Sequence, residues 1–208
     1  MAAMSESVRS RMAELAQTWD EAEAAIKFAE QVSSAVSLAS INELRYAGRR
    51  AVDALRLNSS EQHLEAQEAL LVAIAYARNA RQDAFDAVFD HIARQLEMIP
   101  KRLRISKLSK EQRALFEQLL IEESEVARAI KAKRQRTLGD DRDDYREQVM
   151  SLATKYLGFI RNAEIAYLLE QTKEGPLELL LKRSTVLVYF VTLLAFLTTI
   201  AAAIVQLR

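Results

Sequence analysis

Apolar residues recur every three or four positions along most of the chain, which is the period of an amphipathic α-helix. The pattern is most regular over residues 5–39 and predicts a first helix there. Its apolar stripe consists of Val8, Met12, Leu15, Trp19, Ala22, Ile26, Ala29, Ser33 and Val36. We expect this stripe to lie in the core of its own subunit, with a surface between subunits as the alternative.

Four further amphipathic segments follow, and polar residues mark where they begin. A Ser followed three positions later by Glu or Gln, the spacing of a capping box, opens three of them, at Ser40, Ser59 and Ser109. Pro100 and Gly139 are expected to end two of them. The predicted helices span residues 40–58, 59–98, 109–139 and 140–172. Their large apolar residues are expected to face the core, among them Val52, Leu55, Leu64 and Leu71.

The most apolar segment is 186–205, which contains no charged residue. As a helix rising about 1.5 Å per residue it would be about 30 Å long, the thickness of the hydrocarbon core of a bilayer. The segment therefore predicts a transmembrane helix, reached through a helix that begins near Pro176. Lys182 and Arg183 on the near side agree with the positive-inside tendency.

The organisation expected from these elements is one soluble unit and one anchor. Only Gln206, Leu207 and Arg208 follow the apolar segment, which predicts a C-terminal anchor. Residues 1–175 are expected to form a cytoplasmic antiparallel bundle of about five helices. Residues 176–208 are expected to form the juxtamembrane and transmembrane part of a single-pass protein, with the lipid bilayer as a partner.

Composition supports an all-α fold class and argues against several kinds of chemistry. The 208 residues include no Cys, two His, four Gly and two Pro. A disulfide scaffold, a thiolate metal centre and a cysteine nucleophile are therefore excluded. The scarcity of Gly and Pro leaves little turn chemistry for a β-sandwich or barrel. We expect no metal, no cofactor and no enzymatic activity.

Charge is balanced over the whole chain but unevenly distributed. Residues 1–99 hold 10 basic and 15 acidic side chains, whereas residues 100–137 hold 11 basic and 5 acidic ones. The excess forms two basic clusters, one of Lys101, Arg102, Arg104, Lys107, Lys110 and Arg113, and one of Arg128, Lys131, Lys133, Arg134 and Arg136. They could contact anionic lipid headgroups, complement a helix terminus and solubilise it, or bind nucleic-acid phosphates, which is the less favoured alternative.

Small and polar residues form a seam in the predicted transmembrane helix. Thr185, Thr192, Thr199 and Gln206 recur every seven residues, with Ala195 and Ala202 between them. Such a seam suits close packing against the helix of another copy, which predicts a homo-oligomer. Several copies could instead turn the Thr residues toward a water-filled lumen. The third interpretation is that these Thr hydroxyls bond to the preceding turn of their own helix.

Candidate catalytic groups are few. His91 is preceded by Asp83, Asp86 and Asp90, which share one helix face, most simply as a solvated or interface acidic face with Asp90 pairing to Arg94. Arg56 and His63 are separated by six residues, although the expected helix break falls between them.

Residues 41–55 and 75–85 resemble segments of small bacterial HEPN-like helical bundles. The resemblance covers about residues 40–98, and some proteins of that family are membrane accessory or effector proteins of Cas13b-type antiviral systems. HEPN ribonucleases carry an Arg, four to six residues and a His, which Arg56 and His63 match. The resemblance implies a bacterial inner-membrane location.

Three functional hypotheses follow. The first is a self-associating membrane protein that acts as a pore-like or gating accessory in antiviral defence. The alternatives are an adaptor that tethers a cytoplasmic protein partner to the membrane, and a membrane-bound HEPN-like ribonuclease.

Overall fold

The chain folds into α-helices in the computed structural model, which describes residues 6–102, 108–134 and 145–173. Within these ranges there are six helices and no strand, so the predicted all-α fold is confirmed. The helices are α1 (Glu6–Ser33), α2 (Leu38–Ser59), α3 (His63–Arg102), α4 (Lys110–Arg134), α5 (Arg146–Arg161) and α6 (Ala163–Lys173).

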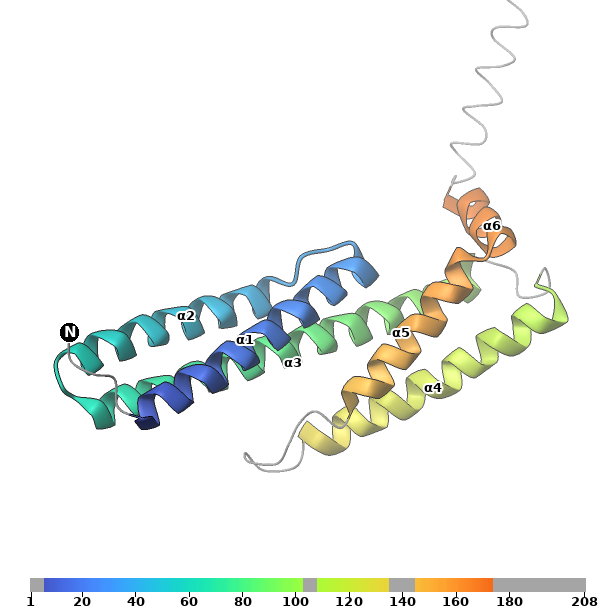
Figure 1. The fold of residues 1–208 in the computed structure, drawn as a ribbon. Helices are drawn as coiled ribbons and strands as arrows, with labels where there is room; N and C mark the ends of the chain where they lie inside the picture. Colours follow the sequence, from blue (N-terminus) through green and yellow to red (C-terminus); the bar gives the residue numbers. More distant parts are fainter. Residues whose placement is uncertain (1–5, 103–107, 135–144, 174–208) are drawn as a thin grey trace, which may run out of the picture.

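The long helix α3 is the centre of the structure, because both α1 and α2 pack along it (Figure 1). Hydrogen bonds join Gln67 to Ser7 and Arg78 to Glu14, and Arg81 forms an ion pair with Glu21. These contacts follow the same order along both helices, so α1 and α3 run parallel. The first three helices therefore form an up-down-up bundle.

The side chains that α3 buries change in size along its length. From Ala66 to Ala84 the helix buries mainly alanines against α1 and α2, namely Ala66, Ala73, Ala77, Ala80 and Ala84, with Leu70 and Ile74 among them. Small side chains let the helix backbones approach closely. Its C-terminal half buries large side chains, namely Phe85, Val88, Phe89, Ile92, Leu96 and Ile99. The core is therefore tight at one end of α3 and thicker at the other.

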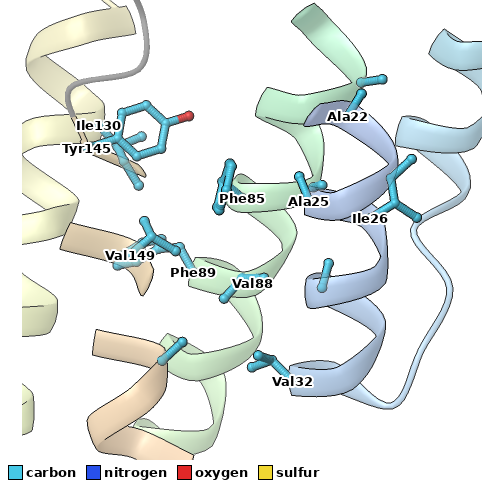
Figure 2. Packing of buried hydrophobic residues seen from close by; sticks show 14 of the residues in the cluster. Ala22, Ala25, Ile26, Val32, Phe85, Val88, Phe89, Ile130, Tyr145 and Val149 are labelled. Atoms are coloured by element: carbon cyan, nitrogen blue, oxygen red, sulfur yellow. The ribbon is translucent and has the colours of Figure 1, made fainter. Parts of the chain in front are cut away.

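The thicker part of the core joins the first three helices to α4 and α5. Figure 2 shows Phe85 and Phe89 of α3 between Ala25 on α1 and Val149 on α5. The Phe28 and Phe85 rings lie 6.3 Å apart between their centroids. Phe85 is thus a shared contact of two groups of helices.

Helices α4 and α5 form an antiparallel pair. Near the start of α4, Gln112 donates a hydrogen bond of 2.7 Å to Glu164 of α6, and the Phe116 ring packs on the Phe159 ring at 5.8 Å. The predicted capping box at Ser109 is confirmed: its backbone N–H donates to Gln112 Oε1 at 2.9 Å, and the Gln112 N–H donates to Ser109 Oγ at 3.2 Å.

The expected single helix over residues 140–172 is wrong in its described part, where two helices lie. The helix is interrupted at Asn162, whose ψ is 124°. Its side-chain Oδ1 accepts hydrogen bonds from the backbone N–H groups of Glu164 and Ile165 at 3.1 and 3.4 Å. Asn162 therefore caps α6, and the bundle has six helices in the described residues rather than about five.

Several predicted helix ends are also wrong. The first helix ends at Ser33, because Ser34 adopts a left-handed backbone with φ of 54°. Ser40 lies buried inside α2, which begins at Leu38, and Ser59 is the last residue of that helix. Pro100 does not end α3, which continues for two more residues.

Five of the large apolar residues expected in the core are instead exposed, four because the packed face of their helix lies elsewhere and Val36 because it lies in the connection between α1 and α2. They are Val36, Val52, Leu55, Leu64 and Leu71, with 44–74% of their surface accessible. On α3 the packed stripe runs through Leu70 and the neighbouring alanines, which places Leu64 and Leu71 at the edge of the contact.

No helix within residues 6–102, 108–134 and 145–173 has both the length and the apolar character needed to cross a bilayer. The predicted transmembrane segment 186–205 and its polar seam lie outside the described residues, as does the expected helix start at Pro176.

Candidate functional site: an acidic groove between α4 and α5

The Arg and His of the ribonuclease-like motif lie on opposite sides of a helix break. Arg56 is exposed in the last turn of α2, and His63 is the first residue of α3. His63 Nδ1 lies 3.1 Å from Oδ1 of the buried Asn58, so this ring tethers the turn between the two helices. The expected helix break inside the motif is confirmed.

The acidic row of α3 is divided among different environments. Asp86 accepts a hydrogen bond of 2.7 Å from the hydroxyl of Tyr145, whereas Asp90 is exposed. Arg94 Nε donates to the backbone carbonyl of Asp90 at 3.1 Å. Arg94 thus contacts the main chain of Asp90 and not its carboxylate, so the expected pairing of the two side chains is wrong. Asp86 is part of the packing between α3 and α5.

Burial and neighbouring charges shift the pKa of Asp83 and the pKa of His91, which follows the acidic row, in opposite directions. Burial raises the pKa of Asp83 above its ordinary value, and the carboxylates of Glu43 and Asp86 raise it further. Burial lowers the pKa of His91, and the nearby Arg94 guanidinium lowers it further. Asp83 and His91 are thus both held toward their uncharged forms.

The basic clusters are only partly described. Of their described side chains, Lys110 and Arg113 are exposed at the N-terminal end of α4, and Arg128 and Lys131 are exposed near its C-terminal end. The backbones of Lys101, Arg102, Lys133 and Arg134 lie in helices. Arg104, Lys107 and Arg136 lie outside the described residues.

The structure adds a feature that the sequence did not reveal, an open groove of about 510 Å³ between α4 and α5. It is lined by Glu122, Glu125, Val126 and Ala129 of α4 and by Glu147, Gln148, Ser151 and Lys155 of α5. Two of its lining residues are apolar, namely Val126, which is buried, and Ala129, which is half-buried. The other lining residues are polar or charged, and three of them are carboxylates.

One carboxylate of the groove is already neutralised within the chain. Lys155 Nζ lies 2.6 Å from Glu122 Oε1, which also accepts a hydrogen bond of 2.9 Å from Gln118. Glu125 and Glu147 carry the remaining negative charge, and both are exposed. The groove therefore offers two accessible carboxylates, an arrangement that suits a basic segment of protein.

Sequence periodicity could not locate this groove because its two walls belong to different helices. The spacing of Glu122 and Glu125 shows that they are neighbours on α4, but it does not show that Glu147 faces them. That pairing depends on the register between α4 and α5, which the contact between Phe116 and Phe159 helps to fix.

The fold and the groove define an all-α helical protein with a charge-segregated surface. Comparison of the chain with family models, curated proteins and solved structures finds no match.

Proposed function

We propose that this chain is a membrane-anchored helical protein that associates with further copies of itself through the acidic groove. The observation that carries the proposal is that α4 has an acidic surface and a basic surface at different positions along its length. The groove lies in its C-terminal half, and exposed Lys110 and Arg113 lie at its N-terminal end. In this arrangement the basic end of one copy docks in the groove of the next.

The geometry of one helix favours contact between copies over contact within a copy. Lys110 precedes Glu122 by 12 residues, which is about 18 Å along a straight helix and well beyond the reach of a lysine side chain. When the groove of one copy binds the basic end of the next, two different surfaces meet, and the contact is head-to-tail. Head-to-tail contacts close into rings or extend as filaments, depending on the rotation between copies.

The apolar character of residues 186–205 supports membrane attachment of this assembly. A ring of copies would bring their membrane helices together, with the seam of Thr and Ala residues facing neighbouring copies or a lumen. A pore-like or gating action is the proposed consequence. A role in antiviral defence depends on the resemblance to HEPN-like proteins alone and stays a prediction.

A charge-exchange experiment tests the head-to-tail contact. Two variants of the full chain are prepared in detergent, Glu125→Lys with Glu147→Lys in the groove, and Lys110→Glu with Arg113→Glu at the basic end. Light scattering should show that each variant alone is monomeric, because like charges then meet at the contact. An equimolar mixture should recover the assembly, because each altered surface then meets its complement.

Glu117→Lys provides the matched control. Glu117 is exposed on α4 outside the groove, so a Glu→Lys exchange there should leave the assembly intact. A parent protein that is monomeric, or groove variants that assemble as the parent does, would refute self-association through the groove. A monomeric parent that captures a basic protein through Glu125 and Glu147 would support the adaptor hypothesis instead.

The ribonuclease hypothesis has a direct test with the same protein. If the hypothesis is right, the parent cleaves RNA, and Arg56→Ala or His63→Ala abolishes that cleavage. The contact between His63 and Asn58 gives the ring a structural role, so we favour the self-associating protein over the nuclease. Absence of cleavage by the parent would end the nuclease hypothesis.

A further inference from the structure

A second cavity, of about 290 Å³, lies where α3, α5 and α6 meet. Its apolar wall is formed by Met98 and Ile99 of α3, Ile160 of α5, and Ala166 and Leu169 of α6. This volume is close to the lower end of the range of about 300–1,000 Å³ that is typical of small-molecule sites. The cavity is therefore large enough for a small organic ligand.

Three polar side chains complete the lining, namely Gln95, Tyr156 and Glu170. Tyr156 has only 4% of its surface exposed, and its ring meets His91 edge-on at 6.3 Å. Neither the Tyr156 hydroxyl nor the side chains of Gln95 and Glu170 form a hydrogen bond with another residue in the described part of the chain. The Tyr156 hydroxyl is nevertheless not closed off from solvent, since it is not one of the fully buried side-chain N or O atoms that lack a partner among the described residues. It is therefore accessible to a molecule in the cavity.

The chemistry of the lining selects among ligands. Glu170 is the one formally charged residue that lines the cavity among the described residues, and it is acidic. The Tyr156 and Gln95 oxygens and the Glu170 carboxylate are all acceptors, and a primary ammonium group has three N–H donors. A carboxylate ligand would instead meet the negative charge of Glu170.

We propose that this cavity binds an amphipathic primary amine, with its ammonium group toward Tyr156, Gln95 and Glu170 and its apolar chain against Met98, Ile99 and Leu169. Met98 is suited to this role because the thioether side chain adapts to ligands of different shape. Burial alone raises the pKa of Tyr156, so its hydroxyl is neutral at physiological pH. The lone pairs of its oxygen can accept a hydrogen bond from the ammonium group. This site is separate from the groove between α4 and α5 and does not depend on self-association.

Methyl NMR of the full chain in phosphatidylcholine nanodiscs tests the proposal. The probe is hexylamine, with hexanol and hexanoate as matched compounds of equal chain length. We expect hexylamine to shift the ¹³C-methyl signal of Met98 in a saturable manner, whereas the exposed Met150 on α5 should not respond. Hexanol and hexanoate should bind at least about tenfold more weakly, because each lacks the charge-assisted hydrogen bonds.

Three variants connect the signal to the cavity. Tyr156→Phe and Glu170→Gln should each weaken hexylamine binding by about tenfold, and Ala166→Phe should abolish it by filling the space. The first two changes are nearly isosteric, so their folds should be preserved even if the larger side chain at position 166 disturbs packing. A Met98 signal that hexylamine does not move, or one that hexanoate moves at equal concentration, would overturn the proposal.

The amine could be a soluble metabolite or the headgroup of an aminolipid. Nanodiscs that contain phosphatidylethanolamine distinguish the two sources. A shift of Met98 in those discs without added hexylamine would assign the site to the lipid headgroup. A shift with hexylamine alone would assign it to a soluble amine.

Discussion

The hydroxyl of Tyr145 donates a hydrogen bond of 2.7 Å to Oδ1 of Asp86, although 59 residues separate them in sequence. Tyr145 directly precedes α5 and is buried, and Asp86 lies in the central part of α3. The bond fixes the start of α5 against α3 beside the contact between Phe85 and Arg146, whose guanidinium lies 5.6 Å from the centre of the ring. The position of α5, and with it one wall of the acidic groove, thus depends on this pair.

Replacing Tyr145 with Phe should therefore destabilise the fold. The variant loses a hydrogen bond to a charged, partly buried acceptor, so we expect a loss of about 1–3 kcal/mol in the free energy of unfolding. Urea titration of the full chain in detergent, followed by circular dichroism, measures the change. Tyr156→Phe is the matched control: its hydroxyl has no partner among the described residues, so the loss there should be below about 0.5 kcal/mol. Equal losses in the two variants would contradict the assigned role of the Tyr145 bond.

The two described helical glycines should respond differently to larger side chains. A Cβ on Gly48 would lie 3.4 Å from Cη2 of Trp19, whereas one on Gly158 would meet no atom within 4 Å. Gly158→Ala should thus stabilise the protein by about 0.5–1 kcal/mol through helix propensity, and Gly48→Ala by the same amount or slightly less.

Leucine separates the two sites more clearly. Gly158→Leu should fold normally, whereas Gly48→Leu should displace the Trp19 ring from between α1 and α2. Trp19 is the one tryptophan of the chain, so its fluorescence emission reports that displacement directly. An unchanged emission spectrum in Gly48→Leu would show that the two helices do not meet at this point.

Asp83→Asn should stabilise the protein at neutral pH, and the advantage should disappear in acid. The pKa of Asp83 is raised in the folded state by burial and by Glu43 and Asp86, so folding opposes its ionisation. The parent therefore loses stability as the pH rises from the unfolded pKa, about 3.9, through the raised folded pKa. At pH values above the folded pKa, the Asn variant avoids this loss of stability because it has no carboxyl group to ionise. Urea titrations of both proteins at several pH values measure it, and an advantage independent of pH would exclude ionisation as the cause.

Sequence periodicity predicted the large core of α3 well because Phe85, Val88, Phe89, Ile92 and Leu96 all follow one helical stripe. It failed in part in the first half of the same helix, where Ile74 is buried as expected but Leu64 and Leu71 are exposed. There the buried positions are mostly alanine, which carries little hydrophobic signal, so the nearby leucines misplaced the packed face.

The hydrophobic pattern also could not predict the break between α5 and α6. The apolar spacing continues across it from Tyr156 and Ile160 to Ile165, and only the capping geometry of Asn162 shows that the helix stops. The groove and the cavity were also missed. Both depend on which residues of different helices meet, and helical periodicity within one segment contains no information about that register.

Exchange of two seam threonines tests the proposed pore. If Thr192 and Thr199 line a water-filled lumen, Thr192→Leu with Thr199→Leu should make that lumen apolar and favour its dewetting. Liposomes containing the parent should release a trapped dye, and the double variant should release it several times more slowly. Thr198→Leu is the matched control, because Thr198 adjoins the seam but does not share its seven-residue spacing. Dye release by the parent that neither change affects would place the leak elsewhere, and a parent that releases no dye would rule out the pore while leaving the head-to-tail contact to its own test.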